Sequence, residues 1–402
     1  MGKLLATDTS IFAIKNEQDK ADVLSFIEKD EWYQPYILEC FVKEILNAPL
    51  FLNQYKEPFE VEYHDGIKIN VPGMDSSDEA LLETAQDTGL LLGFPQGDQG
   101  SSGIIVKPTR YTAFTSICQR AGLSGSTITN SENKPLLSVL PIYEKAHWLS
   151  RGFSLHRAPC KILLRDGKIS CMLSNEYEIM SADKVVPEFE EAIRKDHPDM
   201  SFVSGSFSHE YLLLDYMLND PIMEESFIAM LQEYNISVTT VKAGVRFTTS
   251  DVGNSCLAAA PFYDIDGLRV RLGKPISLSH DKGHTISQFV EKLSMMALVF
   301  KECEDRIEEL GNISIKHPKG CFLHILDENR TLRSGSEGIA DTLDATFPAG
   351  CNAIDIYLAL NQIVEVRNQR GITPTQLINL TEAISKLMFL DYTVYDHEWE
   401  DD

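Results

Sequence analysis

Apolar and polar residues alternate over short stretches of the chain, and Asp-Gly pairs join some of these stretches. An Asp-Gly pair is the strongest two-residue signal for a type I′ turn, which connects neighbouring antiparallel strands. The pairs stand at Asp65-Gly66, Asp166-Gly167 and Asp266-Gly267. The first predicts a hairpin between residues 59–64 and 67–71. Together they favour an antiparallel sheet over a doubly wound parallel one.

Other stretches repeat apolar residues at helical spacing. Residues 36–46 carry such a stripe, and residues 286–311 predict one long amphipathic helix. Residues 353–370 predict another, and Thr373-Pro374-Thr375-Gln376 is a capping box that opens a last helix ending near Leu390. Asp220-Pro221 reads as an N-cap followed by proline in the first turn of a helix.

These patterns predict an α+β fold, in which an antiparallel sheet built from Asp-Gly hairpins packs with long amphipathic helices. We divide the chain into an acidic N-terminal helical and hairpin region (1–104), an α+β core (105–372) and a C-terminal helix with an acidic tail (373–402). We expect the acidic tail to be loose.

The charge is uneven along the 402 residues. The formal net charge is −24, and 43% of the residues are hydrophobic, as in ordinary globular proteins. Residues 1–100 carry −12 and residues 301–402 carry −10, whereas residues 101–175 carry +7. The total excludes binding of a polyanion over the whole surface, because the far field would repel it. A confined basic site remains compatible with these numbers.

Aromatic residues lie among the cations of the basic segment, including Tyr111, Phe114 and Trp148. Cations that meet phosphates beside rings that stack on bases are typical of single-strand binding. A basic face that docks on an acidic face, within the chain or between subunits, is the open alternative. The candidate nucleic-acid-binding residues are Lys107, Arg110, Arg151, Arg157, Lys161, Arg165, Lys168, Arg269, Arg271 and Lys274.

The hairpin registers add detail to this prediction. A two-residue turn at Asp166-Gly167 places Arg165 opposite Lys168, and like charges in that position repel unless something neutralises them. The same register at Asp266-Gly267 places Asp264 opposite Arg269. Arg271 then faces Phe262, so it is the freer of the two cations.

The chain shows no established catalytic or metal-binding motif. The eight cysteines form no C-x-x-C pair and mostly lie in apolar runs, which indicates buried free thiols in a reducing cytosol. His280 and His284 are four residues apart, but Gly283 lies between them and the stretch reads as a loop. The glycine-rich residues 93–103 do not fit a phosphate-binding loop. An enzyme with an unrecognised site remains an alternative, and no cofactor or metal is expected.

No apolar run is long enough to span a membrane, and the first residues lack the core of a signal peptide. We therefore expect a cytoplasmic protein with no membrane partner. The long helices also favour a homo-oligomer.

Residues 163–177 combine an arginine-bearing strand, a turn, a second strand and then Leu-Ser-x-x-Tyr, which includes Ser174 and Tyr177. This stretch resembles the phage/plasmid-like family of domains of unknown function. Residues 247–255 and 353–361 resemble two further segments of that family, so the likeness covers roughly residues 105–370. The usual Cys-x-Asn-Gly segment is missing, and Gly267 to Lys274 stand there instead. A structural reading of the two family positions has Ser174 ending a strand and Tyr177 packing on the sheet with its hydroxyl bonded.

The resemblance implies a protein of phages, plasmids or conjugative elements, often encoded beside DNA-processing genes. Our first hypothesis is a mobile-element protein that binds single-stranded nucleic acid through the basic residues and supports recombination or replication. The alternatives are an acidic anti-defence protein that inhibits a host nucleic-acid-binding complex, with a host protein as its partner, and an enzyme.

Overall fold

The computed structural model describes residues 4–5, 10–34, 41–44, 58–62, 68–72, 90–95, 104–123, 148–149, 151–153, 155 and 159–399. The seven-stranded sheet runs in the order β1-β10-β11-β12-β13-β14, and β15 also pairs with β13. All of its pairings are antiparallel. Its strands are β1 (Phe12–Ile14), β10 (Ser201–Phe207), β11 (Leu212–Met217), β12 (Val241–Thr249), β13 (Leu257–Ile265), β14 (Leu268–Arg271) and β15 (Ile276–Leu278).

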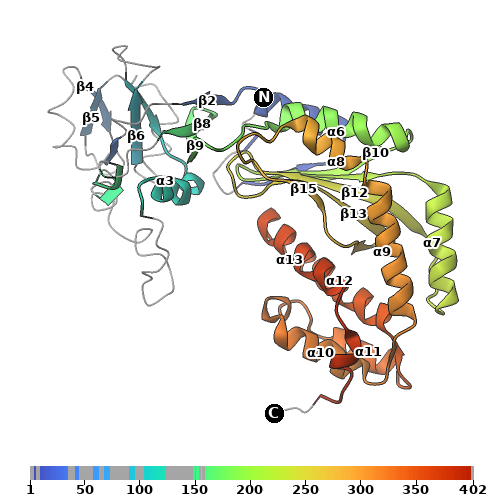
Figure 1. The fold of residues 1–402 in the computed structure, drawn as a ribbon. Helices are drawn as coiled ribbons and strands as arrows, with labels where there is room; N and C mark the ends of the chain where they lie inside the picture. Colours follow the sequence, from blue (N-terminus) through green and yellow to red (C-terminus); the bar gives the residue numbers. More distant parts are fainter. Residues whose placement is uncertain are drawn as a thin grey trace.

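One face of this sheet carries the main apolar core. Phe189 of α6 packs on Tyr216, and Phe289 of α8 packs on Phe247. Figure 1 shows α6 and α8 above the sheet and α12 and α13 below it. The helices of the apolar face are α1 (Glu17–Ile27), α6 (Ala182–Asp196), α7 (Pro221–Glu233), α8 (Ile286–Leu293) and α9 (Met296–Gly311).

The opposite face meets α12 (Ala353–Gln369) and α13 (Pro374–Leu387). Leu213 and Ile378 join the two layers in a small apolar cluster. Further helical segments extend this part of the molecule away from the sheet (Figure 1). They are α10 (Pro318–Glu328), η3 (Arg330–Leu332), α11 (Ile339–Thr346) and η4 (Tyr392–Tyr395), with the short strands β16 (Ser314–Ile315) and β17 (Cys351–Asn352).

Smaller sheets lie to the other side of the molecule (Figure 1). Strands β2, β8 and β9 form one of them, β3, β6 and β7 form another, and β4 pairs with β5. The elements are β2 (Glu31–Tyr33), β3 (Phe41–Glu44), β4 (Pro58–Glu62), β5 (Lys68–Pro72), β6 (Leu90–Pro95), β7 (Ile104–Pro108), η2 (Tyr111–Ala113), α3 (Phe114–Arg120), β8 (Cys160–Arg165) and β9 (Lys168–Ser174).

The α+β class and two of the hairpins are confirmed. Arg165 lies opposite Lys168, and Asp264 lies opposite Arg269, as the two-residue turns require. Asp166 and Asp266 both adopt positive φ, at 51° and 49°, which the type I′ turn demands of its first central residue. The first hairpin differs: Glu62 faces Lys68, one residue away from the expected register. Its Asp65-Gly66 pair lies outside the described residues.

Helix starts were predicted better than helix extents. Asp220 caps α7, and the Thr373 capping box opens α13. The expected single helix over 286–311 is instead two helices, which part at residues 294–295. The reason is packing, because the two helices contact different strands. Phe289 of α8 packs on Phe247 of β12, whereas Phe300 of α9 packs on Tyr263 of β13.

Two predictions about the chain ends were wrong. Residues 41–44, within the expected helix over 36–46, form strand β3 and pair with β6, so sheet pairing outweighs the helical spacing. The acidic tail is held in place as far as residue 399. Tyr392 is fully buried, and the Asp396 carboxylate accepts hydrogen bonds from the backbone N–H groups of Lys316 and His317 at the start of α10.

Candidate functional site

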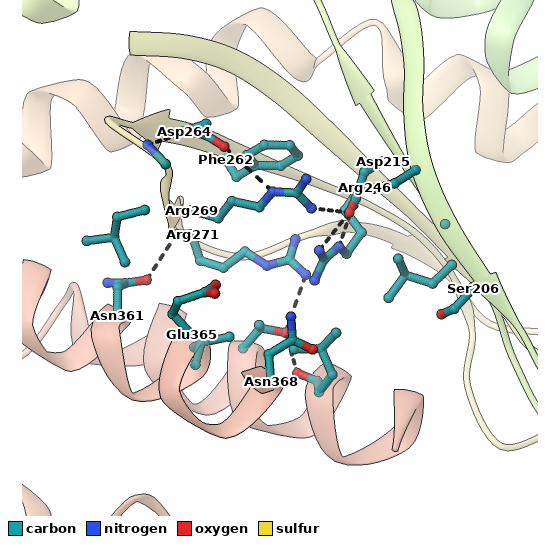
Figure 2. A pocket seen from close by; sticks show the side chains of 18 residues that line it. Ser206, Asp215, Arg246, Phe262, Asp264, Arg269, Arg271, Asn361, Glu365 and Asn368 are labelled. Carbon is teal, nitrogen blue, oxygen red and sulfur yellow. Dashed lines mark hydrogen bonds and ion pairs between the residues drawn. The ribbon is translucent and has the colours of Figure 1, made fainter. Parts of the chain in front are cut away.

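The second face of the seven-stranded sheet is polar. Because side chains alternate across a strand, residues between the core positions of β10 to β14 lie on the face that meets α12 and α13. With those helices they enclose a cavity of about 410 Å³. Figure 2 shows arginines on the sheet side and polar residues of α12 on the other. We call this space the arginine cavity and define it by Asp215, Arg246, Arg269, Arg271, Asn361, Glu365, Asn368 and Thr381.

Asp215 is the buried acceptor of the sheet side. It lies directly opposite Arg246 in the β11–β12 pairing, and its oxygens accept from Nε and one terminal nitrogen of Arg246 at 2.6 and 2.8 Å. Arg269 also donates to Asp215. Burial alone would raise the pKa of Asp215, but Arg246 and Arg269 outweigh it and hold that pKa below its usual value. The carboxylate is therefore ionised and fully engaged by these two cations.

Arg269 has further contacts. Its guanidinium carbon lies 5.4 Å from the centre of the Phe262 ring, and its Nε lies 3.7 Å from an Asp264 oxygen. Arg269 is also the most exposed cation of the group, with a side chain that is 32% accessible. Its charge is thus balanced within the protein.

Arg271 is in a different position. The residue is only 8% exposed, yet among the described residues its terminal nitrogens donate only to Ala260 O at 3.4 Å and Thr381 Oγ1 at 3.3 Å. Among the described residues, no carboxylate lies within 4.0 Å of it. Burial and the neighbouring charge of Arg246 lower its pKa to about 9. Arg271 is therefore a buried cation at neutral pH whose charge has no direct partner.

The backbone around Arg271 is held firmly by α12. The Arg271 N–H donates to Asn361 Oδ1 at 3.2 Å, and its carbonyl accepts from the Tyr357 hydroxyl at 2.6 Å. Asn361 in turn donates to Tyr357 O one helical turn earlier. The end of β14, and with it Arg271, is thus fixed against the helix. An anion in the cavity would meet a guanidinium that is already oriented.

The hairpin cations have a different environment from the exposed strip that the sequence favoured. The Arg165 side chain is 2% exposed, and its guanidinium donates to both oxygens of Asp30 and to Asp251 Oδ2 at 2.9 Å. Burial raises the pKa of Asp30 to about 6, although Arg165 acts in the opposite direction. Two carboxylates of the chain therefore neutralise Arg165, which is the arrangement that the alternative interpretation describes.

Three further residues of the predicted nucleic-acid-binding set, Arg110, Lys161 and Lys168, are buried near Arg165. Arg110 donates to Ser170 Oγ, to Arg165 O and, at 3.0 Å, to Nε2 of His209. Burial and the charge of Arg110 lower the pKa of His209 to about 2, so the imidazole is neutral and accepts this bond. Lys161 donates to Tyr177 O, and Lys168 is 5% exposed. A continuous surface strip through these residues does not fit their burial.

The remaining candidates lie elsewhere. Arg151 and Lys274 are exposed, and Lys107 is half-buried. Arg157 lies outside the described residues. Of the predicted residues that the structure describes, Arg269 and Arg271 line the arginine cavity.

Sequence reasoning missed Asp215 and Arg246. Both were detectable, since each is a charged residue with apolar neighbours on both sides: Asp215 lies between Leu214 and Tyr216, and Arg246 lies between Val245 and Phe247. Charged residues are almost never fully buried unless they are paired. An acid and a base that are each flanked by apolar residues in two neighbouring strands therefore predict a buried pair.

The two family positions have the structural roles expected for them. Strand β9 ends at Ser174, and the Tyr177 hydroxyl donates to Ser250 O at 3.1 Å. The Tyr177 ring stacks on His280, 4.7 Å between centroids. His284 bonds to Ser279 O. Within the described residues, no group of three or more His, Cys, Asp or Glu side chains is arranged to hold a metal ion.

The described cysteines carry free thiols, five of them buried. Among the helices that the structure describes, none has both the length and the apolar character needed to cross a bilayer. The chain matches no protein-family model, no curated protein and no solved structure. The resemblance to phage/plasmid-like proteins therefore stays a prediction.

Proposed function

We propose that this protein binds single-stranded nucleic acid and that a backbone phosphate enters the arginine cavity. The observation that carries the proposal is Arg271, a buried guanidinium beside Arg246 with no carboxylate partner among the described residues. Its unused N–H donors match the oxygens of a phosphate, and a buried cation gains most from such a partner. The sequence resemblance favours nucleic acid of a phage or plasmid as the source of the phosphate, in recombination or replication.

The proposal agrees with the net charge of −24. An acidic exterior disfavours wrapping of a polyanion around the molecule but leaves a confined site with buried arginines accessible. The cavity size also lies within the range of small-ligand sites, so one nucleotide unit fills it better than a long duplex would. Self-association and a cytoplasmic location are further parts of the proposal, and light scattering of the purified chain tests the first.

Fluorescence anisotropy with a labelled single-stranded oligonucleotide tests the binding. We expect binding at low salt that weakens between about 50 and about 200 mM salt, because phosphate contacts release counterions. Absence of binding at low salt, or an affinity that does not change with salt concentration, would overturn the proposal.

Two substitutions on α12 locate the site. Asn368 is an exposed residue on the cavity wall, and Asn368→Glu should weaken binding about fivefold by repelling the phosphate. Gln362 is exposed on the same helix but does not line the cavity, so Gln362→Glu has the same charge change and should leave the affinity nearly unchanged. Equal effects of the two substitutions would place the binding site elsewhere.

A further inference from the structure

The wall of the arginine cavity formed by α12 has a different chemistry from the sheet side. Asn361, Glu365 and Asn368 follow one another at helical spacing and face the same space. Figure 2 shows the Glu365 carboxylate pointing from α12 toward the cavity, below Arg271. An ionised carboxylate accepts hydrogen bonds but cannot donate them, so a ligand group that contacts Glu365 has to be a donor.

Contacts within the protein leave most of the hydrogen-bond acceptor capacity of Glu365 unused. It accepts one hydrogen bond, from Nε2 of Gln369 at 3.1 Å. No Lys or Arg nitrogen of the described residues lies within 4.0 Å of it. The side chain is half-buried at the cavity, so its remaining acceptor sites face the space that a ligand would occupy.

A ligand that satisfies both walls carries an anionic group for Arg271 and Arg246 and a hydroxyl donor for Glu365. A phosphate alone would be repelled by the carboxylate, and an apolar group would leave it without a partner. A ribonucleotide unit has both features on one small frame, and the ribose 2′-hydroxyl is the group that distinguishes RNA from DNA. Carboxylates that accept from ribose hydroxyls recur in nucleotide sites.

We infer that the arginine cavity takes one ribonucleotide unit of a single strand, with its phosphate at Arg246 and Arg271 and its 2′-hydroxyl donating to Glu365. This inference rests on the proposed function and adds the substrate class, RNA over DNA. Binding of a strand is the premise, and the preference between two strands is the new content.

The test compares labelled oligouridylate and oligodeoxyuridylate of equal length, which differ at the 2′ position alone. Anisotropy titrations of the wild-type chain should give about tenfold tighter binding of the ribose strand, the ratio expected for one hydrogen bond to a charged acceptor. Equal affinities for the two strands overturn the inference but leave the proposed function standing. Failure of both strands to bind overturns the proposed function as well.

Variants of Glu365 assign the preference to this side chain. In Glu365→Gln the ratio of the two affinities should fall toward one, because the deoxyribose strand gains affinity from the lost repulsion while the ribose strand also loses its charged acceptor. Glu365→Asp keeps the charge but moves the acceptor away from the 2′-hydroxyl. The ratio of the two affinities should therefore again fall toward one, without a gain in affinity from lost repulsion. Thermal unfolding of each variant checks that it is folded.

Glu382→Gln is the matched control. Glu382 is exposed on α13, acts on Arg271 only through its charge and does not line the cavity. We expect this variant to keep the tenfold ratio. A ratio that survives in both Glu365 variants, or that falls equally in Glu382→Gln, overturns the assignment of the 2′-hydroxyl to Glu365.

Discussion

Arg165 and Arg271 are both buried guanidinium groups, but their partners differ. Arg165 stands between two carboxylates, Asp30 and Asp251, at hydrogen-bond distance. Arg271 has two long bonds to neutral oxygens, and burial and the guanidinium of Arg246 lower its pKa. Asp215 and Glu382 act on Arg271 only through their charge, without direct contact. Arg165 thus has two carboxylates in direct contact, whereas Arg271 has none within 4.0 Å among the described residues.

This difference matters for finding binding sites. Burial of a cation is compatible with a purely structural ion pair, and breaking such a pair leaves an isolated buried charge. A buried cation without a counter-charge is unfavourable in the free protein and is relieved when an anion binds. The balance of partners, and not the number of arginines, therefore separates the two clusters. The predictions below test that separation.

The largest expected effect is the loss of the Arg165 pair. Arg165→Met leaves Asp30 and Asp251 buried without their cation, so the free energy of unfolding should fall by about 3 to 5 kcal/mol. Chemical denaturation followed by circular dichroism measures it. Arg194→Met is the control, because Arg194 is 42% exposed in a helical pair with Glu190 and should cost at most about 0.5 kcal/mol. If both variants lost a similar amount of unfolding free energy, the buried Arg165 pair would be no more important for stability than an exposed pair.

The second prediction concerns Asp30. Its pKa is raised above the unfolded value of 3.8 to about 6, so the folded chain binds the proton more tightly than the unfolded chain. Wild-type stability should therefore decrease as the pH rises from 4 through 6, by an amount on the order of 2 kcal/mol.

Asp30→Asn cannot ionise and should not show this decrease, while Asp251 still pairs with Arg165. At pH 7 the variant should thus be far more stable than Arg165→Met. Denaturation curves at several pH values compare the three proteins. A wild-type stability that increases over this pH range would contradict the expected sign.

The contrast between the clusters also shows how far the sequence could reach. The Asp-Gly turns fix register locally, and for this reason both Arg165 opposite Lys168 and Arg271 opposite Phe262 were predicted correctly. The partners of Arg165 lie 135 and 86 residues away, so no local pattern could indicate that it is buried.

The arginine cavity was also predictable only where local sequence patterns determine its residues. Its sheet side could be predicted from charged residues that lie between apolar ones in the strands, but Glu365 and Asn368 were indistinguishable from other polar residues of a helix. Which face of α12 meets the sheet is decided by contacts such as that of Asn361 with the Arg271 backbone. The break between α8 and α9 has the same origin, since tertiary packing overrode an unbroken helical period.

The third prediction concerns Arg271, for which we expect a small effect on stability in contrast to the large effect at Arg165. Arg271→Met removes an unpaired buried cation and fills its volume with an apolar chain, so the free energy of unfolding should change by no more than about 1 kcal/mol. The same variant should lose the rise in thermal midpoint that inorganic phosphate gives to the wild type. Arg370→Met is the control: Arg370 is exposed at the end of α12 and pairs with Glu337, so this variant should keep the phosphate effect. A large loss of stability in Arg271→Met would show that Arg271 has a structural role like that of Arg165.

The smallest expected effect is the dependence of phosphate binding on pH. The Arg271 pKa lies near 9, below that of an ordinary arginine, so this guanidinium loses its proton as the pH rises through 9. Inorganic phosphate remains a dianion over this range, and the other arginines keep their charge. The phosphate-induced rise in thermal midpoint should therefore be constant from pH 7.5 to 8.5 and decline above about pH 9. Phosphate that binds Arg271 also raises its pKa, so the decline should begin at higher pH as the phosphate concentration increases. A phosphate effect that persists unchanged at pH 10 at every concentration would mean that the anion is held by the paired cations, Arg246 and Arg269, and that the uncompensated charge of Arg271 does not mark the site.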